Sequence, residues 1–213
     1  MNNKVIHADC LDIMKTMSYK SIDLIITDPP YGIKEAAGKN TSRVQLATPK
    51  DYGTLGWDNS KPTQEYFDEM FRVSKNQIIF GGNYFGLPAS SCWVVWDKQN
   101  SGDFADAELA WTSFTSAVRI FKYRWNGMLQ GDMQHKEVRI HPTQKPVPLF
   151  EWLLTKYATP GQTILDPFMG SGSCIIACIN LGFNYIGIEK EESHFKDADK
   201  RIKSALSQSK LVV

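Results

Sequence analysis

Short apolar runs alternate with amphipathic stretches along the chain, and this alternation predicts an α/β fold. The apolar runs expected to form buried strands are residues 4–8, 24–26, 78–80, 92–96, 109–111, 118–125, 163–165 and 182–188. Helical spacing predicts helices over residues 64–73, 147–157, 174–179 and 191–206, and a short helix after Cys10. Asn76 and Gln77 are expected to interrupt the helical pattern after the predicted helix 64–73.

The run I-D-L-I-I-T-D-P-P-Y at residues 22–31 ends in an unusual corner. Pro29 and Pro30 cannot donate to a strand ladder and fix their own φ, so the strand must end before them. Asp28 and Tyr31 flank this stiff turn at the carboxyl end of a strand, which is where open α/β sheets bind ligands. We therefore take residues 28–31 as the candidate catalytic group.

The chemistry of this corner suits an exocyclic amine. The carboxylate of Asp28 and the free carbonyl of Pro29 could both accept hydrogen bonds from one NH₂ group. Such an amine on adenine or cytosine is a poor nucleophile because its lone pair is spread into the ring, and two acceptors would localise that lone pair. Tyr31 could stack on the base. The competing interpretation is a Pro-Pro turn that only stops the strand.

A second corner follows the predicted strand 163–165. The sequence D-P-F-M-G-S-G-S begins at Asp166 and leads into an apolar helix, which is typical of a nucleotide-type crevice. Glu189 ends the next strand and is positioned to bind ribose hydroxyls. The loop lacks a phosphate-binding lysine, which favours a nucleoside derivative over ATP. Gly170 and Gly172 do not complete a G-x-G-x-x-G fingerprint, which argues against a nicotinamide oxidoreductase.

Two further segments are candidates for the same crevice. Asp9 ends the first predicted strand, so it should share a sheet edge with Asp28; it either caps the following helix or faces the ligand. The sequence H-P-T-Q-K-P precedes the predicted helix 147–157. Its Thr143 and Lys145 could meet a carboxylate, and the competing interpretation is a capped loop.

Composition limits the class of protein and the number of domains. The chain has 213 residues, 42% hydrophobic and 22% charged, so we expect one globular domain over residues 1–213. The four cysteines lack metal-ligand spacing and are expected to be small core residues. No apolar run reaches the roughly 18 residues that span a bilayer, and the first residues lack a signal-peptide pattern, so we expect a cytoplasmic protein. Residues 32–60 have no steady period and are expected to be a mobile loop or linker.

Charge is unevenly distributed. The net charge of +1 is a mild argument against nucleic-acid binding, but residues 119–145 hold six cations and two anions, with aromatic residues between the bases. This mixture suits a phosphate backbone and an unstacked base, although a solvated strand face would look the same. The candidate DNA-binding residues are Arg119, Lys122, Arg124, Lys136 and Arg139.

Together these motifs resemble the β-class of S-adenosylmethionine-dependent DNA amino-methyltransferases of the D-P-P-Y type. The resemblance covers nearly the whole chain through H-A-D-C, T-D-P-P-Y-G, the Gly-Gly-Asn strand end, H-P-T-Q-K-P, D-P-F-M-G-S-G-S and I-G-I-E, in the order of that class. It implies a Rossmann-like methyltransferase fold with helices on both faces of a mostly parallel sheet and a circularly permuted motif order. It also implies a short target-recognition insert at about residues 112–140.

The resemblance further implies that S-adenosylmethionine is the cofactor, and that residues 28–31 grip a target base flipped out of double-stranded DNA. Asp9 and Cys10 would face the adenine of the cofactor, Thr143 and Lys145 its carboxylate, Glu189 its ribose, and Asp166, Phe168, Gly170, Ser171 and Gly172 its methionine side. No metal is implied.

The implied reaction is methyl transfer to the N6 amine of adenine in a specific DNA site, since Asp at the first position of the tetrapeptide points to adenine and Ser to cytosine N4. The alternatives are an N4-cytosine methyltransferase, an RNA methyltransferase of the same fold, or a non-catalytic nucleic-acid-binding protein. Ring-carbon methylation is excluded because no cysteine lies beside proline and glutamine. Partners could include a second copy of the chain and a separate restriction endonuclease.

Overall fold

An eight-stranded sheet forms the centre of the molecule. In the computed structural model, which describes residues 3–33, 61–100, 105–126, 129–141 and 143–209, the strand order is β1-β10-β9-β2-β3-β5-β4-β6. The strands are β1 (Lys4–His7), β2 (Ile22–Thr27), β3 (Ser74–Phe80), β4 (Trp93–Asp97), β5 (Ala107–Thr112), β6 (Arg119–Lys122), β9 (Thr163–Asp166) and β10 (Asn184–Glu189). Only β5 runs antiparallel to its neighbours, so the predicted mostly parallel sheet is confirmed.

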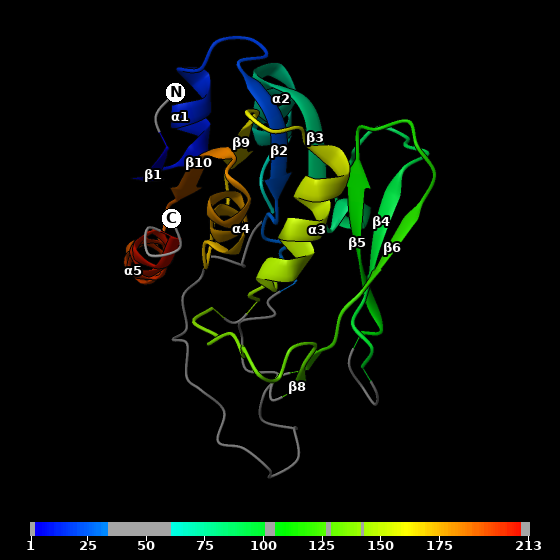
Figure 1. The fold of residues 1–213 in the computed structure, drawn as a ribbon. Coiled ribbons are helices and arrows are strands. Elements are labelled where there is room, and N and C mark those ends of the chain that lie inside the picture. Colours follow the sequence, from blue (N-terminus) through cyan, green and yellow to red (C-terminus); the bar gives the residue numbers. More distant parts are fainter. Residues whose placement is uncertain (1–2, 34–60, 101–104, 127–128, 142, 210–213) are drawn as a thin grey trace.

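Helices cover both faces of this sheet, as expected. They are α1 (Cys10–Lys15), α2 (Gln64–Val73), α3 (Val147–Tyr157), α4 (Ser173–Leu181) and α5 (Glu192–Ser209). The core residues of α1 and α2 belong to one hydrophobic cluster and those of α3, α4 and α5 to another. Figure 1 views the sheet from the side of α3 and α4, with β4, β5 and β6 lying beyond α3. A short 3₁₀ helix (Gly82–Tyr84) and a small hairpin of β7 (Trp125–Asn126) and β8 (Leu129–Gln130) complete the described elements.

The two clusters follow from the twofold period of the strands. Ile78 and Phe80 point to the α3 side of the sheet and Ile79 points to the α2 side, and all three are fully buried. Because successive side chains on a strand alternate between faces, a continuous apolar run fills both cores at once. The predicted buried strands at residues 24–26, 78–80 and 163–165 therefore lie in the middle of the sheet.

Two boundary predictions were wrong. Asn76 and Gln77 do not separate α2 from the next strand but lie within β3, which begins directly after the helix. The hydroxyl of Ser74 donates to the carbonyl of Met70 at 2.6 Å and thereby closes the last turn of α2. The predicted strand 118–125 divides, because β6 ends at Lys122 and β7 begins at Trp125.

The parallel strands bring their carboxyl ends to one edge of the sheet. His7 of β1 lies beside Glu189 of β10, and β2 pairs with β9 in the same direction. Asp28 follows β2 directly and Asp166 is the last residue of β9. In Figure 1 this edge faces downward. The sequence motifs therefore converge in space although they are far apart along the chain.

Three other expectations concern the cysteines, membrane-spanning helices and the loop 32–60. The four cysteines are free and buried, in agreement with the prediction of small core residues. Among the described helices none has both the length and the apolarity needed to cross a membrane. The predicted loop 32–60 lies outside the described residues from residue 34 onward.

We predict that Leu153→Ala destabilises the fold by roughly 2–5 kcal/mol, because it empties a completely buried site between α3 and the sheet. Denaturant unfolding measures this change. Thr155→Ala on the exposed side of the same helix is the control, with an expected change within about 0.5 kcal/mol. Equal losses in the two variants would contradict the packing described for α3.

Candidate active site

A cavity of about 400 Å³ opens at the carboxyl edge of the sheet. Its size lies within the range of small-molecule sites. The predicted cofactor residues that line it are Asp9, Cys10, Thr143, Lys145, Asp166, Phe168, Gly170, Ser171 and Glu189. Gly172 does not line the cavity but turns the chain into α4 with a φ of +75°, and a Cβ there would lie 3.0 Å from the side chain of Ile202. The geometry thus gathers the predicted residues, while their role in binding a cofactor remains a prediction.

Glu189 fastens the glycine loop to the end of β10. One carboxylate oxygen accepts a hydrogen bond from the backbone N–H of Gly170 at 2.8 Å, and the other accepts from the N–H of Glu191 at 2.9 Å. Each oxygen keeps a further lone pair. The carboxylate is therefore held in a fixed position by the backbone and can still accept hydroxyl groups of a ligand.

Asp166 is a buried carboxyl group with few polar partners. It accepts hydrogen bonds from the hydroxyl of Thr27 at 2.8 Å and from the N–H of Phe168 at 3.2 Å. Burial raises the pKa of Asp166 to about 7, although both hydrogen bonds oppose this shift. The group links β2, β9 and the start of the glycine loop.

Asp9 serves both of the roles that the sequence left open. It caps α1 by accepting a hydrogen bond from the N–H of Leu11 at 2.9 Å, and it also lines the cavity. It further accepts from the hydroxyl of Tyr66 and forms an ion pair with Lys190 at 2.9 Å. Burial alone would raise the pKa of Asp9, but these partners lower it, so the carboxylate stays charged.

A second cavity, of about 470 Å³, lies on the other side of the D-P-P-Y corner. It is lined by all four predicted catalytic residues, together with aromatic side chains such as Tyr84 and Trp96. The residues that line both cavities are Asp28, Pro30, Thr143, Gln144 and Lys145. The two cavities therefore meet at the carboxylate of Asp28.

Both oxygens of Asp28 are engaged. The hydroxyl of Tyr31 donates to Oδ1 at 2.5 Å, and the ammonium of Lys145 donates to Oδ2 at 2.5 Å. Lys145 also lies 3.0 Å from Glu108, which forms an ion pair with Lys98. Burial raises the pKa of Asp28 and the positive charge of Lys145 opposes that rise. The sequence placed Lys145 near a cofactor carboxylate, and the structure shows its ammonium between two carboxylates of the chain.

The ring of Tyr31 is fixed by its neighbours. It stacks on Tyr84 with 4.9 Å between ring centroids. Gly81, with a φ of +64°, allows this position, because a Cβ there would lie 2.2 Å from Tyr31 Cε1. The Gly-Gly-Asn strand end noted in the sequence therefore has a physical role, since it makes room for the ring of Tyr31, a predicted catalytic residue.

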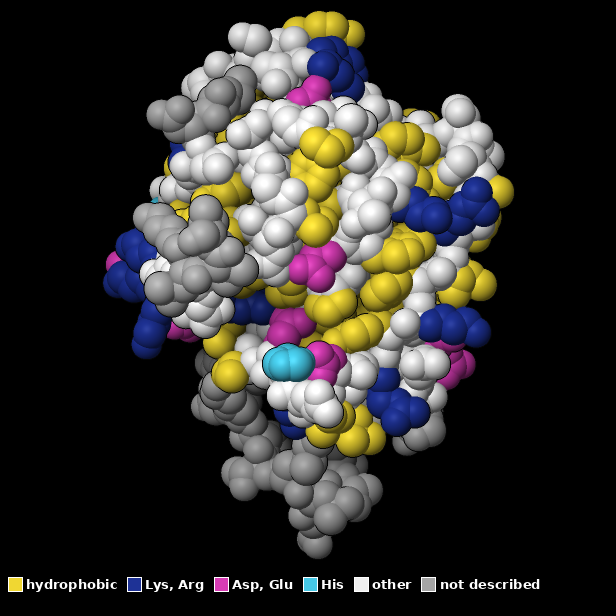
Figure 2. Space-filling model, in the orientation of Figure 1, with side chains coloured by type: hydrophobic (Ala, Val, Ile, Leu, Met, Phe, Trp, Pro, Cys, Tyr) yellow, Lys and Arg dark blue, Asp and Glu magenta, His cyan; other side chains and the backbone are white. Residues whose placement is uncertain are grey.

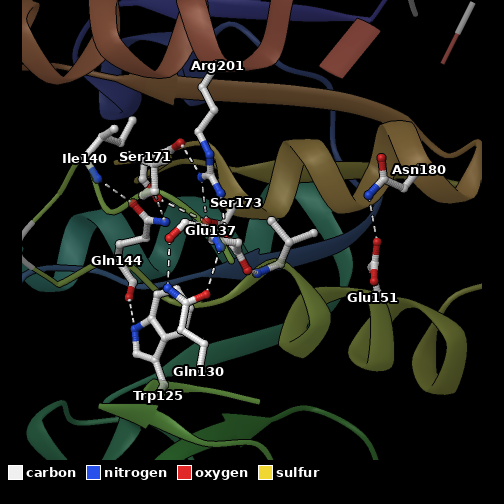
Figure 3. A network of polar contacts seen from close by, with 12 residues as sticks. Trp125, Gln130, Glu137, Ile140, Gln144, Glu151, Ser171, Ser173, Asn180 and Arg201 are labelled. Atoms are coloured by element: carbon white, nitrogen blue, oxygen red, sulfur yellow. Dashed lines mark hydrogen bonds and ion pairs between the residues drawn. The ribbon is translucent and has the colours of Figure 1, made fainter. Parts of the chain in front are cut away.

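Arg201 of α5 braces the glycine loop from behind (Figure 3). Its guanidinium donates to the carbonyl of Ser171 at 3.0 Å and to the hydroxyl of Ser173 at 2.9 Å. It also pairs with Glu137 at 2.7 Å, and the other oxygen of Glu137 accepts from the N–H of Val147 at 2.9 Å. This network joins the loop, α5 and the start of α3.

Four charged residues near the two cavities were not identified as site residues from the sequence: Lys98, Glu108, Glu137 and Arg201. A weak signal for Glu108 was available, because it is a charged residue directly before the apolar run 109–111. Arg201 and Glu137 showed no distinguishing pattern, since charged residues are common on helices and loops. Only their tertiary contacts reveal them.

The predicted DNA-binding residues are mostly exposed. Arg119, Lys122, Arg124 and Lys136 are open to solvent, whereas Arg139 is half-buried with its guanidinium 6.0 Å from the ring of Trp125. Figure 2 shows separate groups of Lys and Arg side chains along the side where β4, β5 and β6 lie, with apolar side chains between them. Their contact with DNA remains a prediction.

Comparison with known proteins now assigns the family. Residues 87–200, more than half of the chain, match the N6/N4 methyltransferase family, described as DNA methylase. The chain belongs to this DNA methylase family. Type II methyltransferase M.HinfI of Haemophilus influenzae is 27% identical to the chain over 251 aligned residues, which cover 94% of this chain and 68% of that protein.

Two solved structures extend the likeness of this DNA methylase to three dimensions. The M1.HpyAVI–SAM complex is 26% identical, with a TM-score of 0.55, and the match covers 93% of this chain and 98% of that one. The cytosine-N4-specific PvuII DNA methyltransferase is 14% identical with a TM-score of 0.59, covering 98% of this chain and 93% of that one. This second likeness concerns the fold alone, and the predicted methyltransferase fold is confirmed.

We predict that Asp166→Asn stabilises the methylase more at pH 8.5 than at pH 5.5, without added ligand. The folded protein holds a proton on Asp166 up to about pH 7, whereas the unfolded chain loses it near the ordinary aspartate pKa of 3.8. Stability of the wild type therefore falls as pH rises through this window, by about 2 kcal/mol between pH 5.5 and 7. Asparagine removes this dependence and keeps the oxygen that accepts both hydrogen bonds.

Denaturant unfolding of variant and wild type at each pH measures the difference. Asp23→Asn is the control, because the pKa of Asp23 is lowered despite partial burial, chiefly by its hydrogen bond with Lys75, and the group is ionised in both states over this range. Its effect should not change between pH 5.5 and 8.5. A pH-independent effect of Asp166→Asn would contradict the raised pKa.

Proposed function

We propose that this DNA methylase transfers a methyl group from S-adenosylmethionine to the exocyclic N6 amine of adenine in DNA. The observation that carries the proposal is the meeting of two cavities at Asp28. One cavity holds the glycine loop and Glu189, and the other holds the D-P-P-Y corner. A methyl donor in the first cavity and a base in the second would place donor and amine on either side of the same carboxylate.

The first cavity fits S-adenosylmethionine in its chemistry. Five carboxyl groups line it, those of Asp9, Asp28, Asp166, Glu189 and Glu191, which suits a ligand with a positively charged sulfur. Glu189, with two backbone-held oxygens, would bind the ribose hydroxyls, and Asp9 and Cys10 would face the adenine. When bound, S-adenosylmethionine supplies a methyl group on a sulfonium whose neutral thioether is a good leaving group.

The second cavity would hold and activate the amine. Asp28 and the carbonyl of Pro29 would accept its two N–H groups, and the amine nitrogen would keep its lone pair for the methyl carbon. The new N–C bond forms as the S–C bond breaks, the sulfur keeps that electron pair, and the nitrogen then loses a proton to solvent. Placing the reactants contributes much of the rate, since effective molarities reach roughly 10⁵ M or more.

DNA is the proposed macromolecular substrate. An amine inside a base-paired duplex cannot enter such a cavity, so the target nucleotide would be extruded from the stack. The aromatic rings of Tyr31, Tyr84 and Trp96 line the second cavity and offer surfaces for an unstacked base. The exposed cations at Arg119, Lys122, Arg124 and Lys136 would contact the phosphates, together with the half-buried Arg139.

The identity of the base is tested by product analysis. The purified protein is incubated with tritiated S-adenosylmethionine and unmethylated duplex DNA, and the DNA is digested to nucleosides for mass spectrometry. We expect N6-methyladenine, in agreement with Asp28 at the first position of the tetrapeptide. N4-methylcytosine would overturn the adenine assignment, and methylation of RNA alone would overturn the DNA assignment. Single-molecule sequencing of DNA from an expressing host would then identify the recognised site.

We predict that two substitutions separate the cavities. Asp28→Ala should lower methyl transfer by at least roughly a hundredfold, because it removes an acceptor aimed at the reacting amine. It should leave S-adenosylmethionine binding measurable. Glu189→Ala should weaken that binding by roughly 10- to 100-fold, as expected for the loss of hydrogen bonds to a charged group.

Isothermal titration calorimetry and the tritium assay measure these two effects. Asp68→Ala, on the exposed surface of α2, is the control and should change neither. Loss of both binding and transfer to the same extent in Asp28→Ala would contradict the role of Asp28. An unchanged affinity in Glu189→Ala would contradict the role of Glu189.

A further inference from the structure

The ammonium of Lys145 lies between two carboxylates at the junction of the cavities. It is 2.5 Å from Asp28 and 3.0 Å from Glu108, and only 5% of the Lys145 side chain is exposed. Glu108 comes from β5, and Lys98, which follows β4, pairs with it from the other side. The result is a row of alternating charges that ends at the proposed catalytic carboxylate.

We propose that Glu108 is a positioning residue for methyl transfer: by sharing the Lys145 ammonium with Asp28, it leaves an oxygen of Asp28 available to the target amine. This role rests on the proposed function. Neither motif that suggested the active site contains Glu108. It does not line the cofactor cavity, and in the second cavity, which it does line, it acts through the neighbouring Lys145.

The need for such a residue follows from the contacts of Asp28. Tyr31 donates to one of its oxygens and Lys145 to the other, so an entering amine meets a carboxylate that already has two donors. If Lys145 had no second acceptor, moving it from Asp28 would leave a buried ammonium without a partner, which is costly. A second carboxylate removes this penalty.

Glu108 has the properties of that second acceptor. Its Oε2 is buried and already lies 3.0 Å from the ammonium of Lys145, within ion-pair distance. Lys145 can therefore loosen its contact with Asp28 and still have an anionic partner in Glu108. The four charges of Lys98, Glu108, Lys145 and Asp28 balance, so the cluster stays neutral during this movement.

The protonation states agree with this arrangement. Burial would raise the pKa of Glu108, but the charges of Lys145 and Lys98 hold it at about 2, so Glu108 remains an anion. Burial raises the pKa of Asp28, which also faces Tyr31 and lies near Asp166, and Lys145 is its cationic partner. Removal of Lys145 would take away the main influence that lowers the pKa of Asp28, so this pKa would rise further.

The alternative is a structural ion pair that only ties β5 to the segment before α3. Such a clamp would affect stability, whereas the proposed role predicts a change in the rate of transfer and in its pH dependence. The two explanations also differ for a double variant, since a residue that acts only through Lys145 should have no effect once Lys145 is absent.

The test is single-turnover methyl transfer to unmethylated duplex DNA by the full chain between pH 5.5 and 9, at saturating tritiated S-adenosylmethionine. We predict that Glu108→Gln lowers the plateau rate at least tenfold, because Lys145 then pairs with Asp28 alone, while calorimetric affinity for S-adenosylmethionine changes less than threefold. Glu108→Asp, which keeps the charge, should recover part of the rate. Glu192→Gln removes an exposed carboxylate of α5 and should leave the rate unchanged.

Lys145→Met gives the second readout. As the pH is lowered, the rate of this variant should begin to fall at a pH at least one unit higher than in the wild type. Asp28 must be ionised to accept the amine, and in this variant it has lost its cationic partner. Glu108→Gln combined with Lys145→Met should be no slower than Lys145→Met alone. Thermal unfolding checks that each variant is folded, and Glu108→Asp carries the comparison if Glu108→Gln does not fold.

The outcomes distinguish the two proposals. A wild-type chain that binds S-adenosylmethionine but methylates no DNA contradicts the proposed function and, with it, this role of Glu108. If the wild type methylates DNA, a Glu108→Gln variant that matches it at every pH overturns the role of Glu108 alone. The same conclusion follows if the effects of Glu108→Gln and Lys145→Met multiply in the double variant.

Discussion

The ion pair between Lys145 and Asp28 is the interaction on which the site depends. It joins the corner after β2 to the segment before α3, two parts of the chain separated by 117 positions. Both groups line both cavities, so the pair fixes the wall that the cavities share. Buried charges are costly unless they are paired, and loss of one partner leaves the other uncompensated. The geometry of the D-P-P-Y corner is therefore inseparable from that of the segment carrying Lys145.

Most of the fold could be predicted from the sequence because local pattern and tertiary structure agree. The buried strands are apolar runs that end at Pro, Gly or an acidic residue, and the spacing of α2 and α3 gave their bounds. The two wrong boundary predictions, at Asn76–Gln77 and at residues 118–125, have their causes in tertiary structure. Polar residues of β3 find partners within the sheet, where Gln77 donates to Ser74. The chain beyond Lys122 turns so that Trp125 can donate to the carbonyl of Gln144 at 2.8 Å.

The candidate site could be predicted to the extent that its residues lie at strand ends. Parallel strands bring their carboxyl ends to one edge, so Asp28, Asp166 and Glu189 had to converge once the sheet was recognised. Glu108 and Arg201 could not be found this way. Glu108 is the second residue of the antiparallel strand β5, whose direction the sequence did not reveal, and Arg201 reaches the glycine loop from a helix with many similar charges.

The two halves of the site are held by different kinds of contact. On the proposed cofactor side, backbone N–H groups fix both oxygens of Glu189, and Arg201 braces the loop through the carbonyl of Ser171. On the proposed target side, the partners of Asp28 are the side chains of Tyr31 and Lys145, which can rearrange without moving the sheet. A preformed pocket suits a ligand that is the same in every reaction cycle. A carboxylate held by exchangeable side-chain donors suits a base that must enter, replace those donors and leave, and Glu108 gives the displaced ammonium a place to go.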